Sequence, residues 1–173
     1  MPEAKKVVFI IAHEKFRDEE FAQPQKILEE KGIKVTVASS SLKKATGMLG
    51  MSVKPDILLH QINVAEYDLV VFIGGAGSSE YWDNPEAHKI AQTFFKEKKL
   101  VAAICIAPVT LANAGLLKGR KATVFSSCAE QIKQKGAIYT GNPVEQDNGL
   151  ITASGPEAAH SFGQALLQAL KNH

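Results

Sequence analysis

The sequence has 173 residues, a length typical of one domain. Hydrophobic residues make up 45% and charged residues 22%, which excludes a disordered or collagen-like chain. Twenty Lys and Arg against 18 Asp and Glu leave a net charge of +2, and no long basic run occurs, so nucleic-acid and membrane partners are not expected.

The two cysteines, Cys105 and Cys128, are too few for a disulfide framework, and no metal-ligand spacing occurs. We therefore expect a reducing compartment and no metal. The apolar run at 7–12 is shorter than a signal-peptide core, and Pro108 interrupts the uncharged stretch at 100–117. Both features favour a cytoplasmic protein without a membrane span.

The first half of the chain alternates buried strands with helices. The apolar run at 6–12 predicts a strand covered on both faces, and 18–31 predicts a helix with an acidic first turn. A second strand is expected at 34–39 and an irregular hairpin at 45–53. A further buried strand at 68–73 runs into the turn Gly74-Gly75-Ala76-Gly77, and a helix is expected at 85–98.

The second half continues the alternation and then relaxes. We expect a strand at 100–104, a helix at 108–114, a strand at 122–125 and a helix at 129–135. Segments 138–140 and 144–153 predict antiparallel additions before a final helix at 157–170. No repeat or linker occurs, so residues 1–173 are expected to form a single α/β domain with an open, mostly parallel sheet.

Loops that leave the carboxyl ends of parallel strands share one edge of the sheet, where ligands usually bind. In this sequence that edge is expected to gather His13, the segment 74–78, Cys105 and the segment 126–128. The sequence therefore predicts a site at this edge.

Cys105 is expected where an apolar strand turns sharply into a helix opened by Pro108, which is the geometry of a nucleophile elbow. Unpaired amides at a helix start favour a thiolate and can donate to an oxyanion. The alternative is that Cys105 is a small buried hydrophobic residue, as free cysteines commonly are.

This elbow resembles that of the ThiJ/PfpI superfamily, which includes intracellular protease I and the parkinsonism-associated deglycase. The resemblance spans nearly the whole chain. It is carried by Ala103-Ile104-Cys105 with Pro108, by Gly74-Gly75, by Asp18-x-Glu20 ahead of Pro24, and by Ser154-Gly155-Pro156. It implies a flavodoxin-like three-layer sandwich, a domain like those of class I glutamine amidotransferases, and no cofactor.

The resemblance also implies that the cysteine faces a carboxylic acid from the first helix, and Glu20 matches that acid by its spacing to Pro24. A glutamic acid shielded from water keeps its proton near neutral pH and can donate it to a thiolate, which would lower the pKa of the thiol. The amides of Gly75 and Ile106 are implied to form an oxyanion site. Without the cysteine, Asp18, Glu19 and Glu20 are better interpreted as acidic decoration of a helix start, and the elbow shifts the preference to Glu20 as the acid.

Three departures from the superfamily pattern bear on function. Protease-like members carry a histidine directly after the cysteine, where this chain has Ile106, and the segment 125–128 supplies none either. His13 is the histidine that the topology places nearest to Cys105, as a possible accessory base. The arginine often found before the last helix is missing from Ser154-Gly155-Pro156, so that segment supplies no cation for a substrate carboxylate.

These features lead to a first hypothesis and two alternatives. The first is a cysteine-dependent enzyme that adds Cys105 to a reactive carbonyl; the resemblance implies glyoxal, methylglyoxal or their early protein adducts as substrates, in a glyoxalase III-like or deglycase-like role in stress protection. The second is a redox-sensing or chaperone-like stress protein in which Cys105 is oxidised to a sulfinate. The third, an intracellular cysteine peptidase or amidase, requires a histidine from a partner subunit.

The resemblance further implies a homodimer that pairs near the first helix. The segment around Gly47 and Gly50 carries Met48, Leu49 and Met51, whose apolar side chains suit an interface. They suit a cap over the monomer core equally well.

Overall fold

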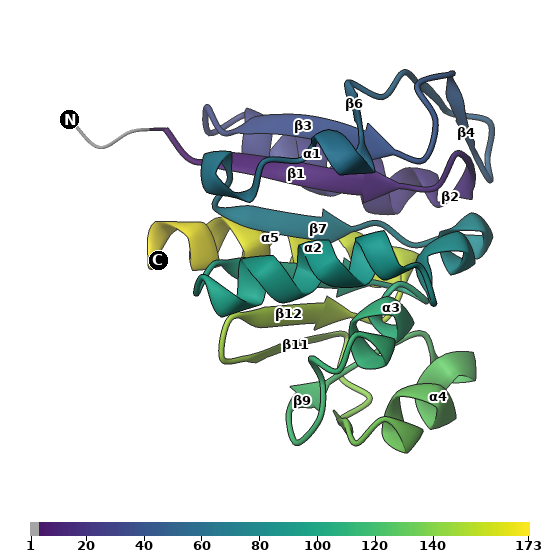
Figure 1. The fold of residues 1–173 in the computed structure, drawn as a ribbon, viewed down its shortest axis with the longest axis vertical. Coiled ribbons are helices and arrows are strands. Elements are labelled where there is room, and N and C mark those ends of the chain that lie inside the picture. Colours follow the sequence, from purple (N-terminus) through teal and green to yellow (C-terminus); the bar gives the residue numbers. More distant parts are fainter. Residues whose placement is uncertain (1–3) are drawn as a thin grey trace.

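The computed structural model describes residues 4–173, which form a three-layer α/β sandwich (Figure 1). Its central sheet has seven strands in the order β11-β12-β8-β7-β1-β3-β6. Every neighbouring pair is parallel except the hairpin of β11 with β12. The strands are β1 (Lys6–Ile11), β3 (Lys34–Ser39), β6 (Ile57–Leu58), β7 (Leu69–Phe72), β8 (Leu100–Ile104), β11 (Val144–Asp147) and β12 (Leu150–Ala153).

Helices cover both faces of this sheet, and the strands alternate their side chains between the two resulting cores. In β1, Val8 and Ile10 belong to one core, while Val7, Phe9 and Ile11 belong to the other, and all five are fully buried. One face carries α1 (Asp18–Glu29) and α5 (Ala159–Lys171); the other carries α2 (Pro85–Lys96), α3 (Pro108–Asn113) and α4 (Ala129–Gln134) (Figure 1). The expected α/β class with a mostly parallel sheet is confirmed.

The expected strand at 122–125 and the expected antiparallel addition at 138–140 are wrong in detail. Only β9 (Lys121–Ala122) and β10 (Ile138–Tyr139) form there, and they pair in parallel with each other outside the main sheet. The place beside β8 is taken by β12, in register from Leu150 opposite Val101. Thr123 lies just past β9 and donates its backbone amide to the Thr152 hydroxyl at 2.9 Å instead of continuing a strand ladder.

A smaller sheet flanks the carboxyl edge and consists of β2 (Glu14–Phe16), β4 (Ala45–Gly47) and β5 (Ser52–Val53), so the expected hairpin at 45–53 is present. Short 3-10 helices join the larger elements: η1 (Leu59–Gln61), η2 (Val64–Glu66), η3 (Ala76–Tyr81), η4 (Ser126–Cys128) and η5 (Pro156–Ala158). Within residues 4–173, none of the helices is both long and apolar enough to span a bilayer.

Candidate active site

Cys105 lies in the turn between β8 and α3, at the carboxyl edge of the sheet. Its φ of +67° is one that a residue with a side chain rarely adopts, and such strain clusters at functional sites. The turn is held on both sides, because the Cys105 amide donates to the Ala153 carbonyl at 2.9 Å and the Cys105 carbonyl accepts from the Phe125 amide at 2.8 Å. The strand-to-helix elbow is therefore present and fixed.

A third contact fixes the residue after the nucleophile. The Trp82 indole nitrogen donates to the Ile106 carbonyl at 3.1 Å. The backbone amides of Ile106 and Gly75 both lie close enough to the Cys105 sulfur to lower the pKa of its thiol. Both amides that were expected to form an oxyanion site thus converge on the sulfur.

Gly74 makes room for Glu20 to approach Cys105. A Cβ atom on Gly74 would clash with the Glu20 Oε1 atom, with the Cys105 Cβ atom and with the Ile104 carbonyl oxygen. Gly75, with φ of +105°, has its backbone pressed against the chain at 15–17, which leads into α1. Only glycine fits between β7 and this segment, so the Gly74-Gly75 turn brings the acid and the thiol together.

Glu20 is fully buried in the first turn of α1. Neither carboxyl oxygen makes a hydrogen bond within residues 4–173. Burial raises the pKa of Glu20 to about 8, although the nearby Cys105 thiol and Gly74 amide each lower it in part. The carboxyl group therefore keeps its proton at neutral pH, as the sequence hypothesis required.

The Cys105 thiol is 8% exposed, and burial raises its pKa. The charge of an ionised Glu20 adds to this effect, so that the pKa of the thiol reaches about 12, a direction opposite to the expected lowering. That repulsion is absent while Glu20 holds its proton, and burial is then opposed by the amides of Gly75 and Ile106. The pKa of the thiol therefore depends on the ionisation state of Glu20.

Two other candidates lie apart from this pair. His13 lines a neighbouring cavity of about 550 Å³ with Ser40 and Glu80, and its backbone amide donates to the Glu80 carboxylate at 3.0 Å. Cys105 does not line that cavity. Cys128 is buried in the opposite core from Cys105, and both cysteines are free thiols.

A second cavity, of about 330 Å³, adjoins the elbow on the side of β12. Two of its lining residues are linked to the backbone of Cys105. The Phe125 amide donates to the Cys105 carbonyl, and Ser154 directly follows Ala153, whose carbonyl accepts from the Cys105 amide. Tyr139 and Glu157 also line it. The cavity therefore adjoins the backbone of the elbow, although Cys105 is not among its lining residues.

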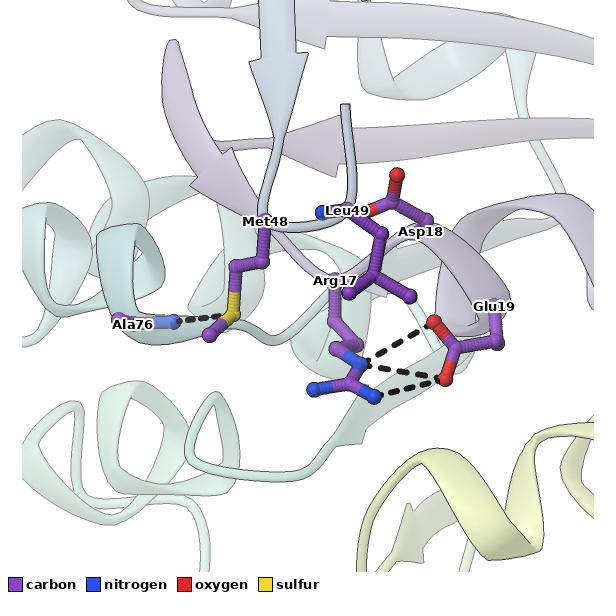
Figure 2. A network of polar contacts seen from close by, with 6 residues as sticks. All are labelled: Arg17, Asp18, Glu19, Met48, Leu49 and Ala76. Carbon is purple, nitrogen blue, oxygen red and sulfur yellow. Dashed lines mark hydrogen bonds and ion pairs between the residues drawn. The ribbon is translucent and has the colours of Figure 1, made fainter. Parts of the chain in front are cut away.

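Sequence reasoning missed Arg17, the residue immediately before α1. Its amide donates to the Gly74 carbonyl at 2.9 Å, and its guanidinium pairs with Glu19 at 2.9 Å (Figure 2). The signal was present in the sequence, because Arg17 precedes Glu20 by three residues, close to one helical turn. Among residues 4–173, no three His, Cys, Asp or Glu side chains gather in a way that could hold a metal ion.

Comparison with known proteins decides the family. Residues 5–169 match the sequence model of the DJ-1/PfpI family. This chain belongs to the DJ-1/PfpI family. The membership confirms the resemblance to the ThiJ/PfpI superfamily that the elbow suggested.

Relatives of this DJ-1/PfpI protein match it over almost its full length. An uncharacterized protein of Methanocaldococcus jannaschii is 39% identical over 97% of this chain and 83% of its own. Deglycase PfpI of Pyrococcus furiosus is 32% identical over 96% of this chain and 99% of its own. The crystal structure of a ThiJ/PfpI domain protein from Brachyspira murdochii superposes with a TM-score of 0.96 at 28% identity, over 99% of both chains.

Proposed function

We propose that this protein is a cysteine-dependent enzyme that acts on reactive carbonyls, converting α-oxoaldehydes such as methylglyoxal to 2-hydroxy acids or releasing them from early protein adducts. The observation that carries this proposal is that the fully buried Glu20 carboxyl and Cys105 both pack against Gly74, where burial raises the pKa of Glu20 to about 8. The deglycase name of the Pyrococcus furiosus relative supports the same class of substrate.

In the proposed reaction the Cys105 thiol loses its proton to solvent, the sulfur forms a bond to the aldehyde carbon of methylglyoxal, and the C=O π electrons move onto the oxygen. The amides of Gly75 and Ile106 donate to that oxygen, which takes the proton that Glu20 carried. The Glu20 carboxylate then moves the C1 hydrogen to C2 as a proton, while the hydroxyl proton passes from the C1 oxygen to the C2 oxygen. Water hydrolyses the resulting lactoyl thioester and restores the thiol, and the proton released by the lactic acid product returns to Glu20.

Peptide cleavage fits this site less well, because protonation of an amine leaving group calls for a general acid such as histidine. Ile106 occupies the place of the histidine in protease-like members. The His88 ring nitrogen is bonded to the Trp82 carbonyl at 2.7 Å, and His13 lines a different cavity. Addition to an aldehyde needs only the nucleophile, the oxyanion donors and one proton carrier, all of which Cys105, its neighbouring amides and Glu20 supply.

The proposed activity is tested by measuring lactate formation from methylglyoxal. We expect Cys105→Ala to reduce the rate about a thousandfold or more, as loss of a nucleophile does in other enzymes. Cys128→Ala is the matched control, because Cys128 is a buried free thiol in the opposite core and should turn over like the wild type. Turnover that survives in Cys105→Ala would refute the assignment.

A further inference from the structure

The cavity beside the elbow lacks a cation for an anionic substrate. Its lining residues include neither lysine nor arginine, and Glu157 contributes a carboxylate. The segment Ser154-Gly155-Pro156, before the last helix, supplies none either. A positive charge at this site must therefore come from the side of α1.

Arg17 lies on that side and is fixed against the glycine turn. Its backbone amide donates to the Gly74 carbonyl at 2.9 Å, and a Cβ atom on Gly75 would clash with the Arg17 nitrogen. Gly74 in turn packs against both Glu20 and Cys105. The guanidinium charge acts on both of these groups, so the backbone contacts and the electrostatics place Arg17 at the same site.

The Arg17 guanidinium is hydrogen-bonded to Glu19, but not all of its N–H groups take part. Its Nε atom donates to both Glu19 carboxylate oxygens at 3.1 and 3.2 Å, and its Nη2 atom donates at 2.9 Å. No residue in the described range 4–173 accepts a hydrogen bond from Nη1, and one terminal nitrogen points away from Glu19 (Figure 2). With its side chain 28% exposed, Arg17 keeps donors available to a ligand.

The adjacent acid, Asp18, does not compete for Arg17. Its two carboxylate oxygens accept from the Leu49 amide at 2.9 Å and the Met51 amide at 2.8 Å. The loop is also tied to η3, since the Met48 sulfur accepts from the Ala76 amide at 3.4 Å (Figure 2). These bonds fix the loop at 48–51 against the start of α1 and leave the Arg17 guanidinium without competition from Asp18.

We propose that Arg17 is a specificity-determining residue that binds the anionic end of a carbonyl substrate, so that the enzyme prefers α-oxoaldehydes bearing a carboxylate or phosphate over neutral ones. This inference rests on the proposed function of Cys105. The aldehyde carbon takes the sulfur, its π electrons go to the oxygen, and Glu20 supplies the proton as before. Arg17 contributes charge-assisted hydrogen bonds to the anionic end and leaves the reacting atoms unchanged.

A matched pair of substrates tests this preference. Methylglyoxal is neutral, whereas 4,5-dioxopentanoate has the same α-oxoaldehyde and a terminal carboxylate, and the reaction would convert it to 2-hydroxyglutarate. We expect Arg17→Gln to lower the ratio of kcat/KM for 4,5-dioxopentanoate to that for methylglyoxal about tenfold or more, the usual effect of losing a hydrogen bond to a charged group. Arg120→Gln is the control, since Arg120 is the other arginine, stacked on Phe95 at 4.7 Å. An unchanged ratio in Arg17→Gln would overturn the proposal.

A second measurement separates this inference from the proposed function, because it needs no turnover. Iodoacetate and iodoacetamide both alkylate thiols, and only iodoacetate is anionic. We expect Arg17→Gln to lower the ratio of the Cys105 alkylation rates, iodoacetate to iodoacetamide, as followed by mass spectrometry, while Arg120→Gln keeps the wild-type ratio. If neither α-oxoaldehyde is turned over, the proposed function fails and this ratio still decides whether Arg17 selects anions. An equal ratio in wild type and Arg17→Gln would refute that selection.

Discussion

Glu20 is a buried acid in a position where stability and chemistry oppose each other. Its side chain is fully buried and its two carboxyl oxygens lack hydrogen-bond partners within residues 4–173, a state that costs free energy on folding. The cost is smallest while the group is neutral. A carboxyl retained under these conditions suits a proton carrier, since its pKa of about 8 lies near neutral pH.

The pH dependence of stability follows from that raised pKa. The folded protein binds the Glu20 proton more tightly than the unfolded chain, whose carboxyl has its ordinary pKa of 4.5. The stabilisation that comes from this tighter proton binding is therefore fully present below pH 4.5. As the pH rises from 4.5 to about 8, the free energy of unfolding falls by about 1.4 kcal/mol per pH unit. We expect the free energy of unfolding of Glu20→Gln, relative to the wild type, to increase from pH 5.5 to pH 7.5 in urea titrations.

Glu19→Gln is the control for this experiment. The hydrogen bond from Arg17 lowers the pKa of Glu19, so this group stays ionised in both folded and unfolded chains above pH 5.5. The difference in the free energy of unfolding between Glu19→Gln and the wild type should therefore be constant from pH 5.5 to pH 7.5. A constant difference for Glu20→Gln as well would show that Glu20 does not hold a raised pKa.

For single residues, the sequence predicted which side chains come together at the site, but it did not predict how they change each other's pKa. Cys105 was selected from a local pattern, the family resemblance added Glu20, Gly75 and Ile106, and the fold brings them together. The direction of the thiol pKa was wrong because desolvation depends on packing around the sulfur, which no local pattern encodes. Arg17 escaped notice because its approach to the site runs through a backbone bond to Gly74, 57 positions away in the sequence.

Among the elements, the strongly patterned ones were predictable and the weakly patterned ones were not. Strands β1 and β8 are apolar runs, β3 alternates valine with polar residues, and all three form as expected. The segment at 122–125 has the same apolar character, yet only its first residue joins a strand, because β12 occupies the edge of β8. Competition between two segments for one strand edge is a tertiary effect that periodicity alone cannot decide.

For the whole molecule, the two edges of the sheet differ in chemistry. A cavity of about 750 Å³ lies at the amino end of β8 and is lined by Lys96, Lys98 and Lys99 among others, without a cysteine. Cys105, Glu20 and the amides of Gly75 and Ile106 all lie at the carboxyl edge. The smaller cavity there is the better candidate because chemistry, rather than volume, identifies a site.

The quaternary structure is a further expectation at this scale. Met48 and Leu49 are 44% and 66% exposed beside the start of α1, where the family resemblance implies pairing. Exposed apolar side chains of this kind favour an interface. We expect sedimentation at micromolar concentration to report twice the 18.7 kDa mass of the chain, and Leu49→Glu to shift that mass toward the monomer. A wild-type species of 18.7 kDa would contradict the homodimer.

The central claim is that Glu20 and Cys105 form one coupled site, and titrating thiolate absorbance tests it most directly. The wild type, Glu20→Gln and Cys105→Ser are compared, and the Cys105→Ser curve removes the contribution of Cys128. Glu20 loses its proton at about pH 8, before the thiol does, and its charge then opposes the thiolate, so we predict a lower thiol pKa in Glu20→Gln than in the wild type. A higher thiol pKa in Glu20→Gln would mean that a protonated Glu20 donates to the thiolate, and an unchanged pKa would mean that Glu20 does not act on the thiol; either result would contradict this coupling.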